Sequence, residues 1–154
     1  MIIKNDESLL RVKCEPVKPE EVDFLRIKLE EELKASAKRG FPGLGLAAPQ
    51  IGIPKTMAIV RIDRGLKIDL VNCRLGNRYD KFIFENEGCL SFPNRYVKTE
   101  RFNQVFVVEN MVEPYNFLAT GLASVVIQHE IDHWFGCLLP DLDIKNMGSM
   151  HSSI

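Results

Sequence analysis

The sequence predicts an α+β fold in which mixed or antiparallel sheets pack around a central helix. Two observations carry this prediction. Apolar residues fill most of positions 121–128, directly before the run HEIDH at 129–133, so this helix is expected to be buried. Strand-like segments separate it from an amphipathic helix nearer the start of the chain. The 154 residues fit one domain, since a chain of this length buries about 68–70% of its unfolded surface.

Two helices are expected. The first covers residues 19–38 and stops before Gly40, because helical spacing places on one face the apolar residues Val22, Leu25, Leu29 and Leu33. It spans under three heptads, which is too short to predict a coiled coil. The second helix covers residues 121–135 and contains HEIDH.

The strands are expected between the two helices, at residues 56–62, 67–73, 79–85 and 104–112. The third of them leads towards Cys89. Beyond the second helix, residues from about 142 to 154 are polar and predict a loose C-terminal tail.

Composition restricts the classes of partner. The net charge of −1 offers no basic surface for direct reading of nucleic acid. No apolar run approaches the length of a membrane span, and the first residues, MIIKNDES, lack the apolar core of a signal peptide. The four cysteines could form two disulfides, but nothing in the sequence suggests export. We therefore expect free thiols and a cytoplasmic protein.

The segment HEIDH places two histidines one helical turn apart. Side chains four residues apart share a helix face, so His129 and His133 can reach one metal ion. Glu130 points to the side, where it is poorly placed as a ligand and well placed to take a proton from a water on the ion. Two alternatives are a solvated helix turn and a structural zinc site with four protein ligands. Cys137 would lie about 12 Å from His129 along the helix, so we expect it to pack rather than bind.

A third ligand must come from elsewhere, as a thiolate or a carboxylate. Cys89, in the segment EGCLS at 87–91, is the best candidate. Gly88 permits a sharp turn before it and Pro93 limits strand pairing after it, so Cys89 is expected at a bend. Taken alone, an isolated cysteine is more often a small core residue.

The segment GLGLAAPQ at residues 43–50 resembles a dinucleotide-binding turn only superficially. That turn needs a strand before its glycines and a helix after them, whereas here a helix-like segment precedes them and Pro49 and Pro54 disfavour a following helix. We interpret it as an extended segment whose backbone lines a site, with Gln50 offering an amide donor. The alternative is an ordinary tight loop.

Together and in this order, GLGLAAPQ, EGCLS and HEIDH resemble the motifs GxGxAAxQ, EGCLS and HExDH of the peptide deformylases. The resemblance covers most of the chain. It implies the deformylase fold, with mixed sheets around a helix that carries the third motif. It also implies removal of the formyl group from N-formylmethionine at the start of new polypeptides.

The resemblance implies a role for each motif residue. The metal ligands would be Cys89, His129 and His133. Glu130 would be the catalytic acid and base. The developing oxyanion would be bound by the Gln50 side chain and the backbone N–H of Leu90. Backbone groups of Gly45 would hold the substrate peptide. The methionine side chain of such a substrate needs an apolar slot, for which we expect the walls Leu44, Leu122, Val125 and Val126, the last two lying one helical turn before His129.

One divalent metal ion per chain is expected. Thiolate and imidazole ligands suit several ions, and the resemblance implies Fe²⁺ in the cell, with Zn²⁺, Ni²⁺ or Co²⁺ as substitutes. Glu87 or Asp132 could accept a hydrogen bond from a ligand histidine, with Arg101 as charge partner. An equally good interpretation of these charged residues is a surface ion pair of little consequence.

The expected partners are N-formylmethionyl nascent peptides. Transient proximity to the ribosome follows, but docking through a C-terminal helix is not expected, because the chain ends 21 residues after His133. The compartment would be a bacterial or phage-infected cytoplasm, with an organelle stroma or matrix as alternative. The alternative functions are an HExxH metallopeptidase and an inactive peptide-binding homologue.

Overall fold

The computed structural model describes residues 1–63 and 65–144, so most of the expected tail lies outside the described residues. The helices are α1 (Glu7–Leu10), α2 (Val22–Lys38) and α3 (Gly121–Trp134), with short 3₁₀ turns at Pro19–Glu21, Ala48–Ile51 and Leu139–Leu142. The strands are β1 (Gly45–Ala47), β2 (Met57–Ile62), β3 (Leu66–Val71), β4 (Arg74–Cys89), β5 (Phe92–Val108) and β6 (Phe117–Thr120).

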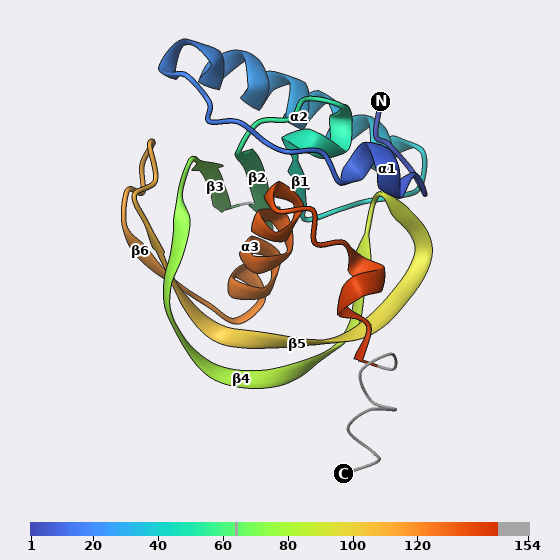
Figure 1. Cartoon of the computed structure of the whole chain (residues 1–154), viewed down its shortest axis with the longest axis vertical. Coiled ribbons are helices and arrows are strands. Elements are labelled where there is room, and N and C mark those ends of the chain that lie inside the picture. Colours follow the sequence, from blue (N-terminus) through green and yellow to red (C-terminus); the bar gives the residue numbers. More distant parts are fainter. Residues whose placement is uncertain (64, 145–154) are drawn as a thin grey trace.

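Two antiparallel sheets enclose α3 (Figure 1). One sheet has the order β1-β2-β3 and the other the order β4-β5-β6. Helix α3 contacts strands of both sheets, while α2 packs on β1 and β2. The expected α+β fold around a central helix is therefore confirmed. None of the described helices is long and apolar enough to cross a bilayer.

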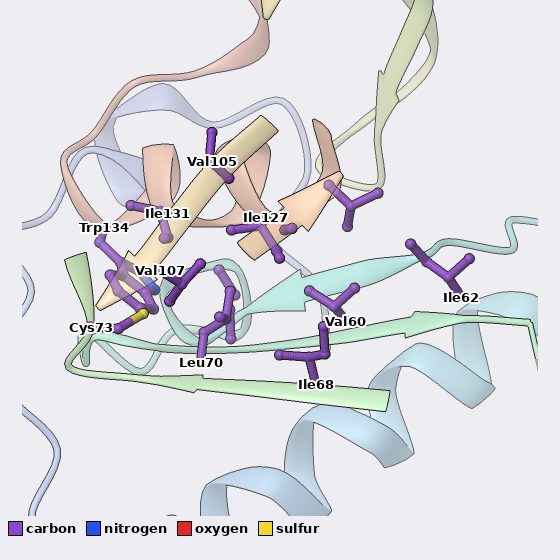
Figure 2. Packing of buried hydrophobic residues seen from close by; sticks show 14 residues of the cluster. Val60, Ile62, Ile68, Leu70, Cys73, Val105, Val107, Ile127, Ile131 and Trp134 are labelled. Carbon is purple, nitrogen blue, oxygen red and sulfur yellow. The ribbon is translucent and has the colours of Figure 1, made fainter. Parts of the chain in front are cut away.

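The main core fills the space between α3 and the two sheets (Figure 2). Strands β2 and β3 contribute Val60 and Leu70, β5 contributes Val105, and α3 contributes Ile127 and Ile131. A second cluster lies between α2 and the first sheet. Helix α3 is thus held by apolar contacts on several sides, which fixes the position of the polar residues it carries.

The amphipathic pattern of the first predicted helix is confirmed. All four apolar residues expected on its inner face are buried, namely Val22, Leu25, Leu29 and Leu33. The expected first turn, from Pro19, is a 3₁₀ turn, and the α-helix begins at Val22. Gly40 follows with a φ of 93°, a left-handed conformation that glycine adopts without strain.

The second sheet is more extended than the sequence indicates. The segments expected at 79–85 and 104–112 capture only parts of β4 and β5, which form a hairpin of 16 and 17 residues. Register shifts interrupt the pairing between Phe84 and Glu87 and between Gly88 and Cys89. Many side chains on β4 are exposed and charged. Apolar and polar residues therefore alternate clearly only in the middle of this strand.

Candidate metal centre and peptide cavity

Three side chains that can bind a metal converge beside α3. Within the described residues, Cys89, His129 and His133 place one donor atom each within 4.8 Å of one another. The Cys89 Sγ lies 3.5 Å from Nε2 of His133, and the two imidazole ring centres are 5.1 Å apart. Helical spacing brings the histidines together, and the β4–β5 turn supplies the thiol from outside the helix.

The chemistry of these donors fits a divalent transition-metal ion. A thiolate with two imidazoles is a ligand set that such ions accept. Burial opposes the charge on the His129 ring, but the Cys89 thiolate and the Glu87 carboxylate raise its pKa well above the ordinary value. Burial lowers the pKa of His133, which favours the neutral imidazole that binds metal. The negative charges of Cys89 and Glu87 therefore favour a positive charge at His129, whereas burial favours the neutral ring of His133.

A buried ion network orients His129. Nδ1 of His129 lies 2.8 Å from Oε2 of Glu87, which leaves Nε2 as the ring nitrogen available for a metal. Glu87 also accepts hydrogen bonds from Arg101 Nε at 2.8 Å and Thr99 Oγ1 at 2.6 Å. Arg101 donates in turn to Asp132 at 2.7 Å.

The charge on Glu87 is stabilised inside the protein. Although burial raises the pKa of its carboxyl group, Arg101 and His129 lower it well below its usual range. The side chains of Glu87 and Arg101 are each 5% exposed. The alternative of a surface ion pair is therefore wrong for this pair, and its link to His129 gives it a place in the site.

Glu130 is enclosed next to the two histidines. Its residue is 3% exposed, and its Oε1 has no hydrogen-bond partner among the described residues. Burial raises the pKa of its carboxyl group to about 7, with repulsion from Glu87 and Asp132 opposing attraction to His129. A carboxyl group with such a pKa can both accept and release a proton near neutral pH.

Gln50 points its amide nitrogen towards the thiol. Its Oε1 accepts a hydrogen bond from the backbone N–H of Ala47 at 2.9 Å. This contact leaves Nε2 to donate to Ser91 Oγ at 3.0 Å and to Cys89 Sγ at 3.6 Å. The 3₁₀ turn Ala48–Ile51, which contains Pro49, folds the Gln50 side chain back towards Ala47 at the end of β1. Sequence reasoning did not single out Ser91, although it closes the segment EGCLS.

A cavity of about 380 Å³ opens onto these groups. Ten of the eleven residues expected at the site line it, the exception being His133, which lies deeper at 2% exposure. Leu44 and Leu122 are 41% and 43% exposed, whereas Val125 and Val126 are buried. The cavity also has walls that the sequence analysis missed, including Phe41, Phe84, Arg95 and Tyr96. They belong to segments without a chemical motif, so only the fold identifies them.

The structure also tests the expected surroundings of Cys89 and Cys137. Cys89 lies at the hairpin turn where β4 ends, so the expected bend is confirmed. Cys137 is exposed, and the expectation that it packs in the interior is wrong. Helix α3 ends at Trp134, and Gly136 then adopts a φ of 70°, which turns the chain away before Cys137.

Comparison with known proteins gives one consistent family. The family model described as polypeptide deformylase matches residues 1–147. A peptide deformylase of Syntrophomonas wolfei is 36% identical over 94% of this chain and 93% of its own length. A peptide deformylase of Hydrogenovibrio crunogenus is 37% identical over 92% of this chain and 83% of its own length.

Solved structures agree with these sequence relatives. A crystal structure of peptide deformylase from Thermotoga maritima is similar with a TM-score of 0.79 and 28% identity, covering 93% of this chain and 96% of that one. A probable peptide deformylase from Synechococcus phage S-SSM7 also gives a TM-score of 0.79, with 32% identity over 92% and 98% of the two chains.

Proposed function

Because this chain belongs to the polypeptide deformylase family, we propose that the cavity beside α3 is where it performs the family's reaction. The chain is a hydrolase that removes the N-formyl group from the start of newly made polypeptides and releases formate. One observation carries the assignment of the site: Cys89, His129 and His133 converge next to Glu130, and all of these residues except the deeper His133 line the cavity.

In this proposal Cys89, His129 and His133 hold one divalent cation, with Fe²⁺ in the cell and Zn²⁺, Ni²⁺ or Co²⁺ as substitutes. When bound, such an ion supplies Lewis acidity and lowers the pKa of a coordinated water towards about 7. Glu87 fixes the tautomer and direction of the His129 ring through the 2.8 Å contact at Nδ1. Arg101 and Thr99 keep Glu87 in that position.

Glu130 carries the proton through the reaction. It takes a proton from the attacking water and later gives it to the amine nitrogen as the bond to the formyl carbon breaks. Its buried carboxyl group, with a pKa raised to about 7 by burial, suits both steps. One carboxyl group therefore serves as base and then as acid.

Gln50 and the backbone N–H of Leu90 stabilise the formyl oxygen as it gains negative charge. The contact with the Ala47 N–H fixes the Gln50 amide and directs its Nε2 towards the Cys89 side of the cavity. Leu90 follows Cys89 directly in the hairpin turn, and both Leu90 and Gln50 line the cavity.

The rest of the cavity holds the peptide. Gly45 presents its backbone N–H and carbonyl groups to the substrate chain, since β1 is extended at the cavity wall. The methionine side chain occupies the apolar part of the cavity, formed by Leu44, Leu122, Val125 and Val126.

An assay with three substrates tests the proposed function. Metal-replete protein is incubated with formyl-Met-Ala-Ser, with unformylated Met-Ala-Ser and with casein. Formate release from the first alone is expected. Casein cleavage would instead indicate a metallopeptidase, and tight peptide binding without formate would indicate an inactive homologue. Elemental analysis of anaerobically purified protein identifies the metal.

We further propose that the reaction takes place in the cytoplasm, in transient proximity to ribosomes, because the substrate is the formylated start of a nascent chain. Co-sedimentation with translating ribosomes, compared for the full chain and a chain ending at residue 144, measures this contact. Equal association is expected, because the polar sequence from about residue 142 onwards does not predict a docking helix.

A further inference from the structure

Gly45 lies where β1 passes the carboxyl group of Glu130. A Cβ atom at this position would be 2.6 Å from Oε2 and 3.1 Å from Cδ of Glu130. It would also be 3.0 Å from the backbone carbonyl oxygen of Ile59. The first distance is too short for a carbon–oxygen contact, so the carboxyl group occupies space that exists only because residue 45 has no side chain.

The need for glycine here concerns space and not backbone conformation. Gly45 pairs with Val60 in regular antiparallel register. The described glycines with positive φ are Gly40, Gly52, Gly121 and Gly136. An alanine at position 45 can therefore keep the backbone, including the N–H and carbonyl groups offered to substrate. The larger adjustment falls on the Glu130 side chain, while the Ile59 carbonyl oxygen at 3.0 Å has to give by a few tenths of an ångström.

Glu130 is positioned by the shape of its surroundings. Its Oε1 has no hydrogen-bond partner among residues 1–63 and 65–144, although the residue is 3% exposed. Glu87 provides the contrast, because its carboxylate accepts hydrogen bonds from Arg101 and Thr99 and contacts His129. Fixed donors to the carboxylate would favour its charged form and so oppose the uptake of a proton.

We propose that Gly45 is a positioning residue for deformylation, because the absence of a side chain there sets where the carboxyl group of Glu130 lies in the cavity. This inference rests on the proposed role of Glu130. It is separate from the backbone contact of Gly45 with substrate, which an alanine would retain.

A thermal unfolding cycle tests the contact without reference to activity. Gly45→Ala is expected to lower the melting temperature by about 2–10 °C, a typical effect of overpacking in a domain of this size. In a Glu130→Ala background the loss should shrink to less than about half of that, because the obstructing carboxyl group is gone. Equal losses in both backgrounds would place the obstruction at Ile59 and overturn the proposal.

Gly43→Ala is the matched control. A Cβ atom at this motif glycine would meet Cδ1 of Leu90 at 2.7 Å, and no atom of Glu130 is among its nearest neighbours. Its effect on the melting temperature should therefore be the same with Glu130 and with Glu130→Ala. A change in the Gly43 effect as large as that for Gly45 would mean that the coupling is not specific.

Kinetics then test the consequence for the reaction. For Gly45→Ala we expect kcat to fall about 10²-fold, the cost of a misplacement near 1 Å, while KM for formyl-Met-Ala-Ser changes less than about threefold. The metal content and the dissociation constant for the product Met-Ala-Ser should stay at wild-type values. A raised KM with unchanged kcat would restrict Gly45 to substrate binding.

The roles of Gly45 and Glu130 can be refuted separately. An unchanged kcat in Gly45→Ala, together with inactive Glu130→Ala, would refute the positioning role and leave the role of Glu130 intact. An active Glu130→Ala variant would refute the proposed proton carrier, and the thermal cycle would still report whether the two residues share this space.

Discussion

Helices α2 and α3 bury their residues in different ways. In α2 the buried residues lie on one face, and its charged residues are exposed or half-buried, with Arg26 and Glu30 paired to Asp69 and Arg61 of the first sheet. In α3, nine of the 14 residues are buried, and they include Gln128, Glu130 and His133. A buried polar group is costly unless it has a partner. The buried face of α2 therefore indicates only where that helix packs. The buried polar residues of α3 indicate in addition that polar or charged partners must lie next to them.

The strongest test of this comparison is Glu130→Ala. Removing the carboxyl group should leave an intact fold and reduce the rate of formate release by about 10²–10⁴-fold, since general acid–base catalysis is lost. Formate release and far-ultraviolet circular dichroism measure the two properties. Wild-type turnover in a correctly folded variant would mean that the buried acid of α3 has no part in the chemistry.

Gln50→Leu should have the next largest effect. Loss of one oxyanion donor typically lowers the rate about 10²–10³-fold. The bound metal should be retained, because Gln50 contacts Cys89 without being a proposed ligand. Turnover and elemental analysis are measured on the same preparation, and loss of metal would contradict the assignment.

Glu87→Gln tests whether the charged partner of His129 matters for metal binding. The amide retains the shape but not the charge next to His129, so metal affinity should fall about 10–100-fold. Competition with a chelator measures the affinity. Glu85→Gln is the control, because Glu85 lies on the same strand but is exposed, with its carboxylate 3.8 Å from Lys98. An equal loss in both variants would argue for a general effect of charge.

Leu29→Ala represents α2 and should have the smallest effect on catalysis. Leu29 is fully buried, so its truncation should lower the free energy of unfolding by about 2–5 kcal/mol while kcat stays at the wild-type value. Ile27→Ala, at a position 55% exposed on the same helix, should change stability by no more than about 0.5 kcal/mol. Urea unfolding measures both. A large drop in kcat for Leu29→Ala would break the contrast between the helices.

The sequence predicts these helices well because each has a distinct local pattern. Strands are harder, since β1 and β6 have only three and four residues and β4 exposes much of its length. Glu87 shows the same limit for the site. Its identity suggested a partner for a histidine, but only the fold reveals that it is buried against Arg101. The cavity wall at Tyr96 depends on hairpin geometry that no local pattern encodes.

The interrupted pairing of the long hairpin has a consequence for how related chains can vary in length. Register shifts lie on both sides of Glu87, and such bulges redirect the side chains next to them. Deleting or adding one residue between Phe84 and Cys89 would turn the acid or the thiol away from α3. A viable insertion should therefore lie outside this segment, where it leaves the spacing of the acid and the thiol untouched.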